Sequence, residues 1–142
     1  MVTLRLPARM DSFGPLRSFV AEEMEREEGL LELIPMAELV LEEILVNVIH
    51  YAYPDREGEI EVACEILSSE KFRLTVKDWG RPFNPLERAD PDLTLDIDSR
   101  EIGGVGIFLV KQMTSDLTYQ YLNGANVLTA WFEKRQPPPG HS

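Results

Sequence analysis

Residues 59–78 read EIEVACEILSSEKFRLTVKD, and this stretch is the clearest guide to the fold. Apolar and polar residues alternate on both sides of the short polar segment Ser68-Ser69-Glu70. Successive side chains of a β-strand point to opposite faces, so this period of two predicts two strands, each with one buried face, joined by a turn. The residues on the two predicted inner faces are Ile60, Val62, Cys64 and Ile66, then Phe72, Leu74, Val76 and Asp78.

The chain before this hairpin is expected to form one short strand and two helices. The alternating segment at residues 4–6 predicts an edge strand, and apolar residues at helical spacing predict a helix over residues 12–28, which Gly29 ends. A second helix is expected over residues 35–53, because a proline suits its first turn and another proline follows its end. Its apolar stripe comprises Leu41, Ile44, Leu45, Val48 and Ala52.

The chain after the hairpin changes character twice. Residues 81–102 contain three prolines and an excess of acidic residues, and an irregular segment of this length in an ordered domain is typically functional. A glycine-rich segment then opens a predicted helix over residues 107–113. Two final strands, 117–122 and 127–132, are joined by Asn123-Gly124-Ala125-Asn126, a segment typical of a hairpin.

The order of these elements is strand, helix, helix, strand, strand, loop, helix, strand, strand. Hairpins beside grouped helices predict an α+β fold, a two-layer α/β sandwich with helices on one face of a mostly antiparallel sheet. We expect a single domain over residues 1–135 and a flexible, proline-rich tail over residues 136–142.

The composition excludes several classes of function. The 142 residues carry a formal net charge of −11 and no basic cluster, which argues against nucleic-acid binding because phosphate contacts need Lys and Arg side chains. A single cysteine allows neither an internal disulfide nor a cysteine-rich zinc site. No apolar run is long enough for a transmembrane helix, and the first residues lack the apolar core of a signal peptide. We therefore expect a cytoplasmic protein with no membrane contact.

Glu43 and Asn47 form the first pair of candidate functional residues. They lie four residues apart on the second predicted helix, roughly 40° apart around its axis and at the edge of the apolar stripe. A carboxylate there can act as a general base, and an amide oxygen can bind a hard cation such as Mg²⁺. From spacing alone, an exposed pair on a solvated helix face is the favoured explanation of these residues.

Asp78 and Gly80 form the second candidate. Asp78 continues the inner face of its strand, and a buried carboxylate requires a hydrogen-bonding partner such as the amino group of a ligand. Gly80 permits a close approach of the backbone to another group. The alternative for this pair is an aspartate that merely forms a tight turn.

The third candidate is the segment Gly103-Gly104-Val105-Gly106 at the start of a helix. Backbone amides at such a place can bind an anion, whereas the alternative is a flexible hinge. The segment is not a P-loop, because no Gly-Lys-Ser/Thr follows it, and it is not a dinucleotide-binding fingerprint. The sequence also lacks the His-Arg-Asp and Asp-Phe-Gly motifs of conventional protein kinases.

Taken together and in this order, the three candidates resemble the N, G1 and G2 boxes of the GHKL (Bergerat-fold) ATP-binding family. The likeness is greatest to its small stand-alone branch, the anti-sigma-factor serine kinases of bacterial partner-switching systems. The stretches that carry it begin at Glu43, Asp78 and Gly103, and the likeness spans residues 2–135. One departure is Pro82, which stands where the broader family has the second glycine of Asp-x-Gly-x-Gly.

The resemblance implies a role for each candidate residue. Glu43 would be the general base that activates a substrate serine, Asn47 would hold Mg²⁺, and Asp78 would accept a hydrogen bond from the adenine amino group. Gly80 would give room for the adenine ring. The residues implied to surround the phosphates of ATP are Gly103, Gly104, Val105 and Gly106, with an ATP lid over residues 86–102 and a phosphate contact from Arg100.

The resemblance also implies partners. The substrate would be a STAS-type anti-anti-sigma protein, a sigma factor would be the alternative partner, and the protein would work as a homodimer. Two other functions remain open: a non-catalytic ATP-binding module that only sequesters a partner, and a detached ATPase domain of a sensor histidine kinase. The second is disfavoured, because His50 and His141 are the only histidines and neither lies on an upstream dimerisation helix.

Overall fold

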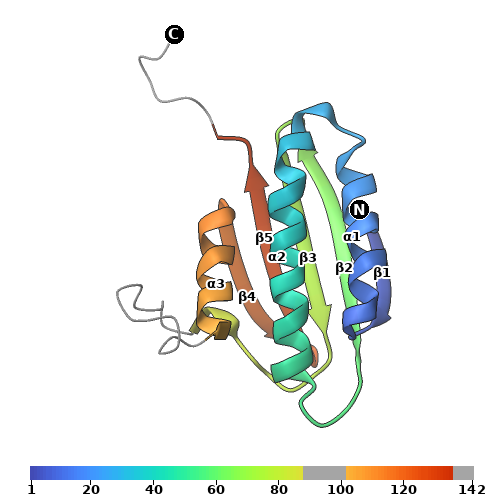
Figure 1. Ribbon diagram of the computed structural model, residues 1–142, viewed down its shortest axis with the longest axis vertical. Coiled ribbons are helices and arrows are strands. Elements are labelled where there is room, and N and C mark those ends of the chain that lie inside the picture. Colours follow the sequence, from blue (N-terminus) through green and yellow to red (C-terminus); the bar gives the residue numbers. More distant parts are fainter. Residues whose placement is uncertain (88–101, 136–142) are drawn as a thin grey trace.

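The computed structural model describes residues 1–87 and 102–135, which form one five-stranded sheet with helices on one face (Figure 1). The strands are β1 (Val2–Pro7), β2 (Glu59–Ser68), β3 (Lys71–Asp78), β4 (Asp116–Leu122) and β5 (Ala125–Glu133). Their order across the sheet is β1-β2-β3-β5-β4, and every neighbouring pair is antiparallel. The predicted α+β fold with an antiparallel sheet is therefore confirmed.

Three α-helices cover the inner face of this sheet (Figure 1). They are α1 (Phe13–Met24), α2 (Ile34–Asn47) and α3 (Ile102–Met113), and α2 continues as a π-helical turn, η3 (Val48–Ala52). Short 3-10 turns occur at η1 (Met10–Ser12), η2 (Glu28–Leu33) and η4 (Pro85–Glu87). Both predicted faces are buried: the α2 stripe packs onto the inner residues of β2 and β3 in one apolar core.

Two helix boundaries differ from the sequence prediction. The first helix ends at Met24 rather than near residue 28, because the chain then turns into η2. Gly29 in that turn packs so closely on the β2–β3 turn that a Cβ atom would overlap the backbone of Ser69. The third helix begins at Ile102, so the glycine-rich segment forms its first turns rather than preceding it.

The β4–β5 hairpin is tighter than the predicted four-residue connection. Its turn is Asn123-Gly124, and both residues have positive φ angles, 53° and 79°. Asn-Gly is the pair that a two-residue type I′ hairpin favours, because both central residues must adopt left-handed conformations. The turn allows β5 to begin at Ala125, which fixes Asn126 directly opposite Asp78 on β3.

In the described ranges, no helix is both long enough and apolar enough to cross a lipid bilayer.

Candidate functional site

A cavity lies between α2 with its π-helical turn, the end of β3 and the segment after it, the start of β5, and the middle parts of β4 and α3. It contains about 380 Å³ of empty space, open mouth included. The polar residues that line it are Asn47, Asp78, Tyr119 and Asn126, and most of the remaining lining is apolar. Asn47 and Asp78, which lie 31 positions apart in the sequence, thus meet at one site, as two of the sequence candidates require.

Asp78 is the buried acceptor at the sheet end of the cavity, with 5% of its surface exposed. Its Oδ1 accepts hydrogen bonds from the Gly80 amide and from Asn126 Nδ2, each at 2.9 Å. Burial raises the pKa of the Asp78 carboxyl, and the hydrogen bonds from Asn126 and Gly80 partly oppose that rise. In the described part of the chain, neither of these bonds uses Oδ2, which keeps its capacity to accept.

Asn126 lines the same cavity, and the sequence did not single it out as a candidate. Its Nδ2 also donates to the Arg81 carbonyl at 2.9 Å. Its Oδ1 accepts from the Phe83 amide at 3.0 Å and from the Tyr119 hydroxyl. The available signal was a polar residue at an inner-face position of an otherwise apolar strand, but its partners depend on the β3–β5 pairing.

Asn47 lies at the helix end of the cavity, with 4% of its surface exposed. Its Nδ2 donates to the Glu43 carbonyl one turn earlier, at 2.7 Å, which fixes the orientation of the amide. Its Oδ1 is buried and has no hydrogen-bond partner among the described residues. An orphaned buried acceptor costs about 1–3 kcal/mol, and a bound cation would satisfy it. Asn47 Oδ1 is thus a suitable ligand atom for a hard divalent ion.

Glu43 is partly buried beside the start of α3. A Cβ atom on Gly106 would overlap its carboxylate, so the glycine leaves the space that this side chain occupies. Burial, followed by repulsion from Glu42, raises the pKa of the Glu43 carboxyl. A raised pKa brings a carboxylate closer to the range in which a general base works best at neutral pH.

Gly80 is held tightly against the end of the second helix. A Cβ atom at this position would lie 2.6 Å from the carbonyl carbon of Ala52, so any larger residue would push the two segments apart. The next amide, that of Arg81, donates to the Ala52 carbonyl at 3.0 Å. The expected close backbone approach at Gly80 is confirmed, and the neighbour is the protein's own helix.

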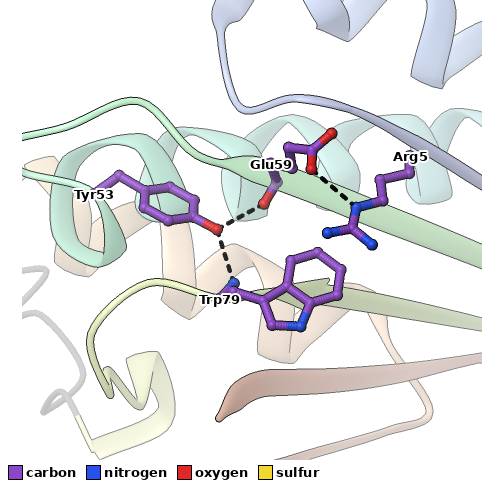
Figure 2. Close-up of polar contacts among 4 residues, drawn as sticks. All are labelled: Arg5, Tyr53, Glu59 and Trp79. Atoms are coloured by element: carbon purple, nitrogen blue, oxygen red, sulfur yellow. Dashed lines mark hydrogen bonds and ion pairs between the residues drawn. The ribbon is translucent and has the colours of Figure 1, made fainter.

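Tyr53 joins the end of the helical layer to two strands, as Figure 2 shows. Its hydroxyl donates to the Glu59 carbonyl at 2.8 Å and accepts from the Trp79 amide at 2.7 Å. Arg5 completes the cluster: its Nε lies 3.2 Å from Glu59 Oε1, and its guanidinium lies 3.9 Å above the Trp79 ring. The cluster holds the end of β3, which carries Asp78, in a fixed position relative to the helix that carries Asn47.

Of the remaining sequence candidates, the structure describes the backbone of the glycine-rich segment but not Arg100. Gly103, Gly104 and Val105 lie in the first turns of α3, whose Gly106 contacts Glu43. Arg100 and residues 88–101 of the expected lid lie outside the described residues.

Comparisons with known proteins give a family match and similar chains. The model of the family described as "Histidine kinase-like ATPase domain" matches residues 6–132. The chain is similar to the serine-protein kinase RsbW of Listeria monocytogenes, with 26% identity over 95% of this chain and 89% of that protein. The corresponding kinase of Staphylococcus aureus is 24% identical over the same shares of both chains.

A solved structure matches the fold. It is the histidine kinase domain of the Erythrobacter litoralis EL346 blue-light activated histidine kinase, with a TM-score of 0.52 and 18% identity. The match covers 87% of this chain and 59% of that one, and at this identity it supports the fold alone.

Proposed function

The chain belongs to the histidine kinase-like ATPase family, and we propose that it is a Mg-ATP-dependent protein serine kinase and anti-sigma factor. In this proposal it phosphorylates a STAS-type anti-anti-sigma protein in a bacterial partner-switching system. The observation that carries the proposal is Asn47 Oδ1, which is buried in the same cavity as the Asp78 carboxylate and has no hydrogen-bond partner in the described part of the chain. The serine-protein kinase names of the two bacterial relatives support the reaction class.

The sheet end of the cavity suits an adenine ring. Asp78 Oδ2 would accept a hydrogen bond from the 6-amino group, while apolar side chains such as Val76, Phe83 and Leu128 contact the faces of the ring. Phe83 is itself stacked on Tyr51, with ring centroids 4.7 Å apart, so this wall of the cavity is supported from behind. Gly80 would act at the same end through its amide, which donates to Asp78 Oδ1 and so orients the carboxylate towards the ring.

The helix end of the cavity suits the phosphates. Asn47 Oδ1 would bind Mg²⁺, which when bound neutralises charge on the phosphate oxygens. The backbone amides at the start of α3, within Gly103–Gly106, would face the same oxygens, because a helix N-terminus favours negative charge. Arg100 would add a phosphate contact from the lid segment.

Glu43 would be the catalytic base. It would accept the proton of the substrate serine hydroxyl as the serine oxygen bonds to the γ-phosphorus and the bond to the β–γ bridging oxygen breaks. ADP then leaves with the electrons of that bond, and the serine keeps the phosphoryl group. Such transfer needs positioning and charge stabilisation more than covalent chemistry from the protein.

The partners follow from the same proposal. A STAS-type protein would present the serine, a sigma factor would be the alternative partner, and the working form would be a cytoplasmic homodimer. A net charge of −11 on this chain favours partners whose docking surfaces carry basic patches.

The test uses ATP labelled at the γ-phosphate, Mg²⁺ and the STAS-type proteins of the source organism. We expect label on one serine of one of these proteins, and none with Glu43→Gln. The matched control is Glu42→Gln, which changes the neighbouring carboxylate and should leave transfer intact. Bound ATP without label on any STAS-type protein would instead favour a non-catalytic module that sequesters its partner.

A further inference from the structure

The polar groups at the sheet end of the cavity are saturated in a way that limits which base can bind. Asp78 Oδ1 accepts two hydrogen bonds, from the Gly80 amide and from Asn126 Nδ2, and this fills the accepting capacity of one carboxylate oxygen. The carboxylate therefore has one oxygen left to offer a ligand. That single oxygen suits one amino group, whereas two adjacent donors on the edge of a base align with the two oxygens of a carboxylate.

The donors around Asp78 are engaged as well. Both hydrogens of Asn126 Nδ2 are used, one on Asp78 and one on the Arg81 carbonyl. The Tyr119 hydroxyl donates to Asn126 Oδ1, and the Gly80 amide donates to Asp78. These groups leave no donor for a ligand, so a base with an oxo group at this position would meet only acceptors.

We propose that Asn126 is a specificity-determining residue that, by occupying Asp78 Oδ1, selects 6-aminopurine nucleotides over 2-amino-6-oxopurine nucleotides. The proposal rests on the proposed function, because it assumes that the base lies at the sheet end. Adenine presents one donor there, its 6-amino group. Guanine presents a 6-oxo acceptor and two donors, N1–H and the 2-amino group, which need both oxygens of a carboxylate.

Asn126 also holds the backbone that follows β3, so a structural role must be separated from selection. It bonds the Arg81 carbonyl and the Phe83 amide, and it is 4% exposed. Tyr119→Phe is the matched control, because it removes a bond to Asn126 and leaves Asp78 Oδ1 saturated. A merely structural role would make the two variants alike in nucleotide preference.

The experiment measures dissociation constants for ATP, GTP and ITP by calorimetry with the whole chain. We expect the wild type and Tyr119→Phe to prefer ATP. In Asn126→Ala the preference for ATP over GTP should fall by about tenfold, since a hydrogen bond to a charged group contributes on that order. The preference over ITP should fall less, because hypoxanthine lacks the 2-amino donor that would use the freed oxygen.

A second variant, Asp78→Asn, tests the proposal independently if Asn126→Ala fails to fold. It keeps the hydrogen bonds from Gly80 and Asn126. Its amide oxygen should take the place of Oδ1, because Gly80 and Asn126 both donate there. Its amino group would then face the ligand, and the preference should reverse towards ITP and GTP. Reversal supports the proposal.

Two outcomes overturn the proposal. One is an equal loss of affinity for all three nucleotides in Asn126→Ala, and the other is an unchanged preference for ATP in Asp78→Asn. A wild type that binds none of the three nucleotides is a different failure, because it refutes the proposed function itself together with this inference.

Discussion

The two ends of the cavity differ in how their polar groups are satisfied. At the sheet end, Asp78 and Asn126 share a hydrogen-bond network in which Asn126 uses both its amide donors and its carbonyl oxygen. At the helix end, Asn47 keeps a buried oxygen that has no hydrogen-bond partner within residues 1–87 and 102–135, and Glu43 has a carboxyl pKa raised by burial. The protein itself thus orients the Asp78–Asn126 pair and leaves Asp78 Oδ2 able to accept a bond, whereas no such network of described residues surrounds the Asn47 oxygen at the helix end.

Under the proposed function, this difference assigns base selection to the sheet end and metal binding to the helix end. A saturated network holds its geometry before any ligand arrives, which is what discrimination between bases requires. An unsatisfied acceptor costs about 1–3 kcal/mol in the empty protein and recovers that cost when a cation binds. Substitutions at the two ends should therefore have different consequences, and the following predictions run from the largest effect to the smallest.

Glu43→Gln should remove catalysis while leaving binding unchanged. We expect the rate of phosphotransfer to fall by about 10²–10⁴-fold, the range that a general base contributes. The dissociation constant for ATP should stay close to that of the wild type, because the carboxylate acts on the serine rather than on the nucleotide. Single-turnover transfer and calorimetry measure the two quantities, and full transfer activity in the variant would refute the assignment.

Asn47→Leu should abolish the effect of Mg²⁺ on ATP binding without destabilising the fold. The variant lacks the oxygen that would hold Mg²⁺, so added Mg²⁺ should no longer tighten ATP binding. The free energy of unfolding should stay within about 1 kcal/mol of the wild-type value, because removal of a buried oxygen that lacks a partner in the described residues offsets loss of the Nδ2 bond to the Glu43 carbonyl. Calorimetry with and without Mg²⁺ and urea unfolding test both parts. A marked loss of stability would show that Asn47 is structural.

Tyr53→Phe should remove the two hydrogen bonds that connect the end of the helical layer to the sheet. It leaves the Trp79 amide and the Glu59 carbonyl without the hydroxyl that now bonds both. We expect the free energy of unfolding to fall by about 1–3 kcal/mol, with weaker ATP binding at the displaced Asp78. Tyr121→Phe, at a position 47% exposed, is the control and should change stability by less than about 0.5 kcal/mol. Equal stability of the two variants would contradict the role given to Tyr53.

The pH dependence of stability should carry the smallest effect. The pKa of the Asp78 carboxyl is raised by burial, so the folded state keeps its proton at pH values where the unfolded state has released it. Stability attributable to Asp78 therefore falls as pH rises from the ordinary carboxyl range through the raised pKa. Asp78→Asn should melt at a higher temperature relative to the wild type at about pH 7 than at about pH 4. A difference of opposite sign would show that the charged carboxylate is stabilised.

The sequence predicted what depends on local pattern. Alternation in residues 59–78 predicted both strands and the inward position of Asp78, and Asn123-Gly124 predicted the hairpin. The spacing of Glu43 and Asn47 predicted that both lie at the edge of the α2 core stripe, whereas the structure buries Asn47 and leaves Glu43 half-buried.

What the sequence could not predict depends on contacts between distant segments. The role of Asn126 requires β5 to pair with β3, which sequence periodicity does not specify. The neighbour of Gly80 is Ala52, at the end of a π-helical turn that no local pattern indicates. The start of α3 was placed too late, because glycines are poor helix formers in isolation and here tertiary packing overrides that preference.

The most direct test of the central claim is a crystal structure of the chain with Mg²⁺ and a non-hydrolysable ATP analogue. The account predicts the adenine amino group within hydrogen-bonding distance of Asp78 Oδ2 and the metal ion bound to Asn47 Oδ1. A nucleotide bound outside this cavity, or a metal ion held without Asn47, would contradict the account.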